Sequence, residues 1–174
     1  MRRWWPLLAV LVALLVTAGI GWSRYTNLRP LSSGVATRTE PLMVNGASFR
    51  VLDLQRLQRI TFTDHDPLVA PDGAVWVRLD AEVTLVDASV DPATLNCYGV
   101  LVSAGNEWTD DYDPASYSGD YAQKLCNKAA DEQPLQPGVP KRLVLHWLVP
   151  TWAADDARYY LRLATPPTAL ELLP

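Results

Sequence analysis

Histidine is scarce in this 174-residue chain, which contains two histidines, two cysteines and two methionines. Zinc and copper sites need several His, Cys or Met ligands, so the sequence predicts no such metal site and no cofactor. His65 stands between Asp64 and Asp66 in a polar stretch typical of a solvated turn, with a ligand role as the alternative. His146 interrupts an apolar run, where packing or a cross-strand hydrogen bond is its expected role.

Basic residues are also fewer than acidic ones. The chain has 15 Lys and Arg residues against 19 Asp and Glu residues, a net charge of −4. Arg2 and Arg3 precede an apolar run, so the remainder carries 13 basic residues (15 − 2) against 19 acidic ones, or −6. Nucleic acid binding depends on basic surfaces, so we expect no nucleic acid partner.

Motifs for catalysis are missing as well. The sequence contains no Gly-x-Ser-x-Gly elbow, no phosphate-binding loop and no dinucleotide fingerprint. Sequence-adjacent carboxylates such as Asp110 and Asp111 do not define two acids facing each other across a cleft, which a glycosidase needs. We therefore predict that the protein is not an enzyme and has no catalytic residues.

The chain has one long apolar run, which is free of charge from Trp4 to Ser23. A helix from Trp4 to Trp22 would span about 28 Å at about 1.5 Å per residue, close to the ~30 Å hydrocarbon core of a bilayer. Tryptophans at both ends suit the two membrane interfaces. We predict residues 1–23 to be an uncleaved transmembrane signal-anchor. The alternative is a signal peptide cleaved near Val16-Thr17-Ala18, which would make the protein secreted.

The two cysteines, Cys97 and Cys126, enclose 28 residues. They form no Cys-x-x-Cys motif and have no neighbouring histidine to activate a thiolate. Two cysteines outside a cell usually pair, so we predict a disulfide and an extracytoplasmic domain, with two buried free thiols as the alternative.

Residues 24–41 are rich in Ser, Thr, Arg and Pro and have no sustained period, which indicates an extracytoplasmic linker. A partly ordered first strand around Gly34 to Arg38 is the alternative. From Leu42 onward the pattern changes to short apolar runs separated by Pro and Gly. Residues 42–174 are therefore predicted to form one domain.

Strict alternation marks residues 75–87 as a half-buried antiparallel strand. Its predicted core face is Val75, Val77, Leu79, Ala81, Val83 and Leu85, and its predicted wet face is Trp76, Arg78, Asp80, Glu82 and Thr84. Further strands are predicted within 47–63, 97–104, 141–150 and 157–165. About seven short strands joined by turns indicate an all-β, two-sheet antiparallel sandwich.

The order of five segments carries a resemblance: GASFRVLDL, DGAVWVRLDAEVTLVD, YGVLVSAGNEW, LQPGVPKRLVLHWLVP and YYLRL. Together they resemble a family of bacterial immunoglobulin-like domains of unknown function, sometimes called telokin-like. Mycobacterial secreted immunoprotective antigens share the architecture. The match covers Leu42 to Leu163. It implies an immunoglobulin-like sandwich, export, and membrane or lipid anchoring, and it implies no catalytic residue.

The stretch EWTDDYDPASYSGDY, residues 107–121, combines acidic and aromatic residues between the two cysteines. Its carboxylates offer oxygens of the kind Ca²⁺ binds, but the EF-hand template fails, because Ser116 stands where Gly is needed and Ala122 replaces the final Glu. A solvated loop is therefore favoured over a cation site. The low-ranked cation-binding candidates are Asp110, Asp111, Asp113 and Asp120.

Tyr and Trp on a tethered loop are good contact residues for a protein partner. The predicted partner-binding residues are Trp108, Tyr112, Tyr117 and Tyr121. The sequence therefore predicts a membrane-anchored, extracytoplasmic protein-binding or assembly module of the bacterial cell envelope, with an unidentified envelope protein as partner. The alternative is a secreted ligand- or calcium-binding β-sandwich protein.

Overall fold

The computed structural model describes residue 17 and residues 32–174, except 112–113, 115–124, 130–132 and 165–167. The chain divides into a unit of residues Met1–Leu31 and a compact unit of residues Ser32–Pro174. The predicted signal-anchor falls outside the described residues apart from Thr17, so it stays a prediction. In the part of the chain that the structure describes, no helix is long and apolar enough to cross a membrane.

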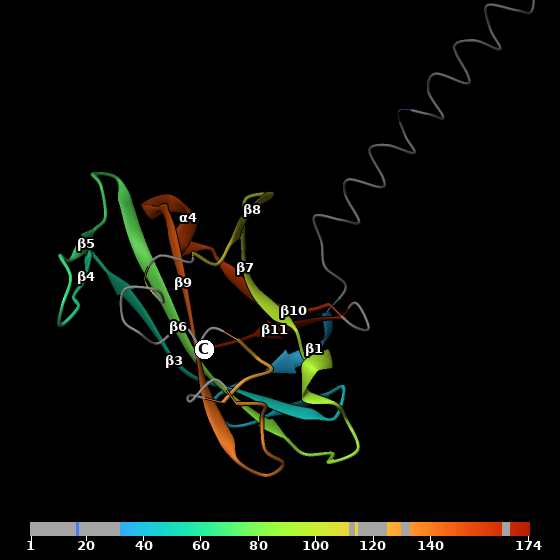
Figure 1. Ribbon diagram of the computed structural model, residues 1–174. Helices are drawn as coiled ribbons and strands as arrows, with labels where there is room; N and C mark the ends of the chain where they lie inside the picture. Colours follow the sequence, from blue (N-terminus) through green and yellow to red (C-terminus); the bar gives the residue numbers. More distant parts are fainter. Residues whose placement is uncertain (1–16, 18–31, 112–113, 115–124, 130–132, 165–167) are drawn as a thin grey trace, which may run out of the picture. The chain divides into compact units, whose positions relative to one another are not determined.

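The long alternating strand lies inside a four-stranded antiparallel sheet (Figure 1). This strand, β6 (Ala74–Leu85), pairs with β3 (Ala47–Leu57) on one side and β9 (Pro140–Pro150) on the other. The short strand β2 (Leu42–Val44) adds to β3, giving the order β2-β3-β6-β9.

The second sheet has five strands in the order β1-β11-β10-β7-β8. They are β1 (Ser32–Ala36), β11 (Thr168–Leu172), β10 (Arg158–Leu163), β7 (Cys97–Ser103) and β8 (Asn106–Thr109). All neighbours are antiparallel except β1 and β11, which are parallel. Strand β1 lies within the predicted linker, so the folded unit extends to Ser32 rather than beginning at Leu42.

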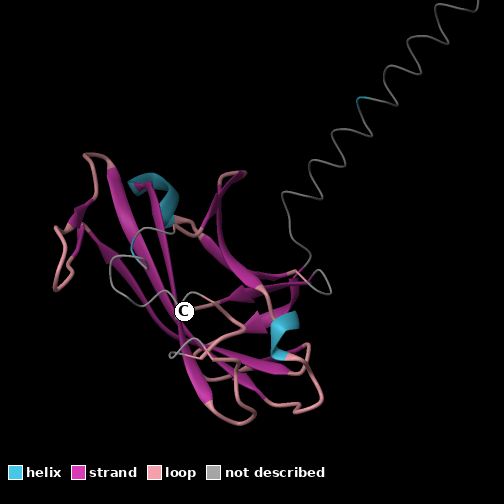
Figure 2. Ribbon diagram, in the orientation of Figure 1, coloured by secondary structure: helices cyan, strands magenta, loops and turns pink. Residues whose placement is uncertain are grey.

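The chain changes sheets four times, between β1 and β2, β6 and β7, β8 and β9, and β9 and β10. β6 leads to β7 through the 3-10 turn η1 (Pro92–Thr94), and β9 leads to β10 through the short helix α4 (Thr151–Asp155). The result is a mostly-β sandwich, as Figure 2 shows. The described residues form eleven strands where about seven were predicted, and most of the additional ones are short.

The core lies between the two sheets. Every residue on the predicted core face of β6 is at most 5% exposed, which confirms that assignment. From β9, the inner face contributes Leu143, Leu145, Trp147 and Val149, and from β10 it contributes Tyr159, Leu161 and Leu163. Gly99 allows close approach across this core, because a Cβ there would lie 2.8 Å from Trp147 Cζ2 and 2.9 Å from Leu145 Cδ1.

The opposite face of β6 is not uniformly wet, which corrects the prediction. Trp76 is 4% exposed because it packs with Ile60 and Ala70 in a second, smaller apolar cluster. The short hairpin β4 (Arg59–Ile60) and β5 (Leu68–Val69) supplies part of that cluster. Alternation shows which residues share a face, but it cannot show that the preceding hairpin covers one end of that face.

Asp80, on the same face, is also buried, at 3% exposed. Its two carboxylate oxygens accept hydrogen bonds from Arg78 and Arg142, so two guanidinium groups compensate the buried charge. Arg50 and Glu82 form a further pair on this face, with 2.9 Å between Nη2 and Oε1. The sequence marked these residues as polar, but it did not indicate that they form a partly buried ionic network.

Candidate functional site

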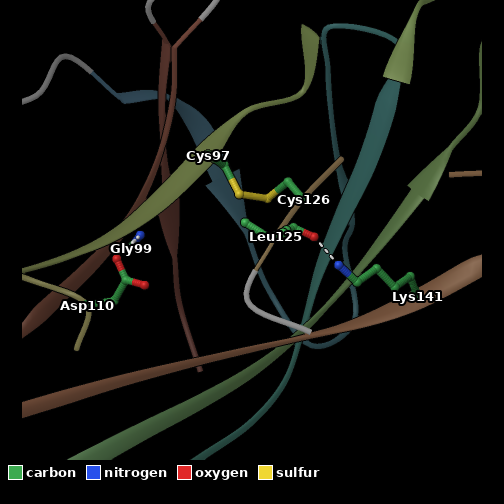
Figure 3. The surroundings of a disulfide bond; sticks show 6 residues. All are labelled: Cys97, Gly99, Asp110, Leu125, Cys126 and Lys141. Atoms are coloured by element: carbon green, nitrogen blue, oxygen red, sulfur yellow. Dashed lines mark hydrogen bonds between the residues drawn. A yellow bond between two sulfur atoms is a disulfide. The ribbon is translucent and has the colours of Figure 1, made fainter. Parts of the chain in front are cut away.

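The disulfide joins the start of β7 to the chain that returns from the acidic stretch. Cys97 and Cys126 are bonded, with 5.7 Å between their Cα atoms, which confirms the predicted pairing (Figure 3). Both are buried, at 8% and 0% exposed. Because the bond lies in the core, its role is to hold the end of the acidic stretch against the sandwich.

A buried lysine supports the same segment. Lys141 lies on the inner face of β9 and is 6% exposed. Its amine donates a hydrogen bond to the Leu125 carbonyl, next to the disulfide (Figure 3). Burial lowers the pKa of the Lys141 amine from its ordinary value of 10.5 to about 8. Sequence reasoning assigned no role to this lysine, although it lies two residues before Leu143 and therefore on the same face of the strand.

The acidic stretch begins as a strand rather than as a loop. Ala104 and Gly105 have positive φ angles of 46° and 79°, as a two-residue hairpin turn requires, and they fold β8 back onto β7. Glu107, in β8, accepts two hydrogen bonds from the Arg162 guanidinium of β10, at 2.8 Å each. The first acidic residue of the stretch therefore belongs to an ion pair on the sheet surface.

Asp110 ends the pairing of β8 with β7. Its N–H donates to the Gly99 carbonyl at 2.9 Å, and its carboxylate Oδ1 accepts from the Gly99 N–H at 3.0 Å (Figure 3). The side chain thus takes the place of the backbone carbonyl that would continue the ladder, and the chain leaves the sheet there. Asp110 has a structural role that sequence reasoning did not assign.

The chain then crosses to the edge of the other sheet. The Asp111 N–H donates to the carbonyl of His146 in β9, at 2.6 Å. His146 itself is 7% exposed and stands opposite Arg78 in the β6–β9 ladder. A buried position in a strand is what the sequence predicted for this histidine.

The remaining predicted site residues are only partly accounted for. Of the cation-binding candidates, the structure describes Asp110 and Asp111, while Asp113 and Asp120 lie outside the described residues. Across the described ranges, no group of three or more His, Cys, Asp or Glu side chains could hold a metal ion. Tyr112, Tyr117 and Tyr121 also lie outside them, so of the predicted partner-binding residues only Trp108 can be placed.

Trp108 meets a second tryptophan that the sequence reasoning missed. Its ring contacts Trp152 edge to face, with 6.1 Å between the ring centroids and 67° between the planes. Trp108 is half-buried against the core, whereas Trp152, on α4, is 52% exposed. The only signal in the sequence is a tryptophan placed two residues after the proline that ends a predicted strand.

Helix α4 is held firmly although it has only five residues. Its own residues Ala153 and Ala154 are buried, and the Thr151 N–H donates to the Gly73 carbonyl at 2.9 Å. Arg56 donates to Asp155 Oδ1 at 2.7 Å and to the Ala154 carbonyl at 2.6 Å. These contacts fix the backbone that presents Trp152.

Comparison with known proteins gives a fold and no function. No protein-family model matches the chain, and no curated protein matches its sequence. A conserved hypothetical protein from Bacillus anthracis is similar in structure, with a TM-score of 0.53, 15% identity, and coverage of 78% of this chain and 94% of that one. At this identity the likeness concerns the fold alone.

Two further solved structures show weaker similarity. One is an uncharacterised β-sandwich protein from Clostridium difficile 630, with a TM-score of 0.49, 10% identity, and coverage of 83% of this chain and 95% of that one. The other is the yjhA protein from Bacillus subtilis, with a TM-score of 0.48, 9% identity, and coverage of 79% and 98%.

Proposed function

We propose that this chain is a membrane-anchored, extracytoplasmic protein-binding or assembly module of the bacterial cell envelope, without catalytic activity. Its contact surface would be the end of the sandwich formed by β8 and α4. The observation that carries the proposal is Trp152, which is 52% exposed while Trp76 and Trp147 are 4% and 0% exposed. Exposed tryptophans on a rigid backbone are over-represented among residues that dominate binding energy in protein interfaces.

The envelope location rests on two features of the chain. A buried disulfide favours an oxidising compartment, because cytosolic proteins rarely keep one. The uncharged run from Trp4 to Ser23, preceded by Arg2 and Arg3, favours a membrane anchor over a cleaved signal. The alternative, a secreted ligand- or calcium-binding domain, would follow from cleavage of this run.

We also infer kinship with the bacterial immunoglobulin-like, telokin-like domains, whose architecture the mycobacterial secreted immunoprotective antigens share. Support comes from the connectivity of four strands: β6 pairs with β9 in one sheet, β7 pairs with β10 in the other, and the chain changes sheets between β6 and β7 and between β9 and β10. This Greek-key arrangement is the centre of an immunoglobulin-like sandwich.

A photo-cross-linking experiment tests the proposed contact surface. p-Benzoylphenylalanine is placed at position 152 of the full chain in its native cells, and, as a control, at position 86. Val86 is 53% exposed, like Trp152. It directly follows Leu85, the end of β6, and Leu85 lies about 36 Å along the strand from Ala74 at ~3.3 Å per residue. We expect one discrete cross-linked protein from position 152 and none from 86. Equal or absent cross-linking at both positions contradicts the proposal.

Cell fractionation tests the anchor separately. The full-length chain should remain with the membrane after a high-salt wash, and protease added outside the membrane should digest the disulfide-bonded domain. A shorter soluble form in the medium would favour the secreted alternative and contradict the anchor.

A further inference from the structure

We propose that two copies of the chain pair along β8, so that their five-stranded sheets join into one antiparallel sheet across a two-fold axis. This inference goes beyond the proposed function, because it does not depend on which envelope protein the module binds. It starts from the place of β8 at the end of the strand order β1-β11-β10-β7-β8, where, among the described strands, β8 has a neighbour on one side only. Such an edge presents backbone N–H and C=O groups that can pair with another chain.

The register of β8 on β7 shows which backbone groups of β8 point outwards. Asp110 and Gly99 form a hydrogen-bonded pair, because the Asp110 N–H donates to the Gly99 carbonyl at 2.9 Å. Bonded and non-bonded pairs alternate along an antiparallel ladder, so Trp108 is bonded to β7, whereas the N–H and C=O groups of Glu107 and Thr109 point away from it. Within the described part of the chain, no residue is bonded to these outward groups.

The other three edges of the two sheets are less available than β8. Strand β9 begins and ends with proline, and its edge is joined to the chain after β8, because the Asp111 N–H donates to the His146 carbonyl. The edge at β1 is joined to β3, because the Val51 N–H donates to the Thr37 carbonyl. Strand β2 has three residues, and after its two-residue turn only the backbone groups of Met43 point outwards. Prolines, covering segments and short strands are the usual means of preventing such pairing, and β8 contains neither proline nor lysine.

The side chains of β8 suit pairing with a second copy of the chain. When Glu107 of each copy stands opposite Thr109 of the other, the outward N–H and C=O groups of both strands pair with each other, and the two Trp108 residues are opposed. No two like charges then face each other directly. The two Glu107 carboxylates are diagonal neighbours, and each already accepts two hydrogen bonds from its own Arg162, at 2.8 Å each. Pairing therefore leaves neither carboxylate without a counter-ion.

Each copy also contributes a tryptophan to the interface. The opposed Trp108 residues form a non-hydrogen-bonded pair, the kind in which side chains approach most closely, and aromatic cross-strand pairs stabilise a sheet. Trp108 lies on the core side of β8 and contacts Trp152 edge to face, with 6.1 Å between the ring centroids. The two-fold axis would therefore bring two such tryptophan pairs to one place, and both copies would build the proposed contact surface.

Analytical ultracentrifugation of the full chain in a non-ionic detergent, with two variants of the edge, tests the inference. Thr109→Pro removes an outward N–H from each copy but keeps the ladder with β7, in which this N–H takes no part. Thr109→Val keeps the N–H and is the matched control, and equal melting temperatures of the two variants show that the fold is retained. We expect the parent and Thr109→Val to form a reversible dimer, and Thr109→Pro to dimerise at least about tenfold more weakly. A parent that is monomeric at high micromolar concentration, or a Thr109→Pro variant that dimerises as tightly as Thr109→Val, overturns the inference.

Disulfide cross-linking tests the register independently of the proline variant. Trp108→Cys places two cysteines opposite each other with about 4.5 Å between their Cα atoms, which is within reach of a disulfide. Asn106→Cys is the control, because the exposed Asn106 would lie about 13 Å along the strand from its counterpart at ~3.3 Å per residue, beyond that reach. With oxidised glutathione added, Trp108→Cys should form a covalent dimer and Asn106→Cys should not. Equal or absent cross-linking of the two variants contradicts the paired β8 strands.

The outcome is separable from that of the proposed function. A monomeric chain with a different protein cross-linked at position 152 would leave the binding module in place and remove the dimer. A dimer that is lost in Thr109→Pro, with no second protein cross-linked at position 152, would leave the dimer in place and remove the envelope partner. A cross-linked product made of two copies of this chain counts for the dimer alone.

Discussion

Trp147 and Trp152 stand on either side of Pro150, and they belong to two different regions of the molecule. Trp147 lies in the middle of β9, fully buried between the sheets and 5.8 Å from the ring of Tyr159. Trp152 lies on α4 with half of its surface exposed. The same residue type therefore builds the core in one place and a candidate contact surface in the other. Backbone position decides the difference: Trp147 is on the inner face of a sheet strand, whereas Trp152 is on a short helix that connects the two sheets.

The largest expected effect is at Trp147. Trp147→Ala should lower the free energy of unfolding by about 3–5 kcal/mol, because it leaves a cavity in a fully packed core. Trp152→Ala should change it by less than about 1 kcal/mol, because an exposed side chain loses little packing. Urea denaturation of both variants, followed by far-UV circular dichroism, measures this. Similar losses for the two variants would contradict the contrast between core and surface.

The disulfide comes next, because it ties the end of the acidic stretch to the core. Replacing Cys97 and Cys126 together by Ser should lower the free energy of unfolding by about 3.5 kcal/mol, the value for closing a loop of this length. The measurement is urea denaturation with and without dithiothreitol. The parent should fall to the level of the variant on reduction, and the variant should be indifferent to reductant. A parent that is insensitive to reduction would show that the bond does not stabilise the fold.

Lys141 breaks the apolar pattern on the inner face of β9 and should make the core sensitive to pH. The folded-state pKa of about 8 lies below the ordinary 10.5, so the folded protein binds this proton less tightly than the unfolded chain. The contribution to stability is fully present above about 10.5 and is lost as pH falls towards 8. Raising the pH from 7 to 10 should therefore stabilise the parent relative to Lys141→Met by about 1–3 kcal/mol. Denaturation titrations at the two pH values measure this. An equal change in unfolding free energy for the parent and for Lys141→Met would count against a buried amine.

The smallest expected effect is at Asp110, where the acidic stretch leaves the sheet. Asp110→Ala should cost about 1–2 kcal/mol of unfolding free energy, because the buried Gly99 N–H loses its acceptor. Asp110→Asn keeps an oxygen in place and is the matched control, which should cost clearly less. Thermal denaturation measures the stability loss of each variant. If the two variants melt together below the parent, the carboxylate charge matters rather than the hydrogen bond.

The sequence predicted best where a strand is long and its two faces differ. Alternation located β6, β7, β9 and β10 and their inner residues, because burial between two sheets imposes a period of two. It did not locate β11, and it gave a strand near β1 only as the alternative to a linker; these two strands are short and pair with each other although they are far apart in the sequence. No local sequence pattern identifies the strand with which β1 or β11 pairs, since this pairing depends on tertiary packing.

The candidate site was predicted less well, for a physical reason. The disulfide was predicted because two cysteines in an oxidising compartment usually pair, and Trp108 was selected as a contact residue because of its residue type. Trp152 was missed because α4 is a single helical turn that follows from the change of sheet after Pro150, and a helix of five residues has no readable period. Residues 107–109 were assigned to a solvated loop, because the polar composition of this stretch hides a strand that follows a two-residue hairpin turn.

The parallel pairing of β1 with β11 has a consequence for biogenesis. Ser32 is among the first residues of the sandwich to be synthesised, yet its ladder partner, Ala169, is among the last. The five-stranded sheet cannot acquire its outer strand until nearly all of the domain has left the ribosome. Because a sheet edge stays unpaired until then, the nascent chain should be open to pairing with other chains until β1 and β11 meet. The order of strands thus delays final closure of the sandwich until almost all of its own residues have been synthesised.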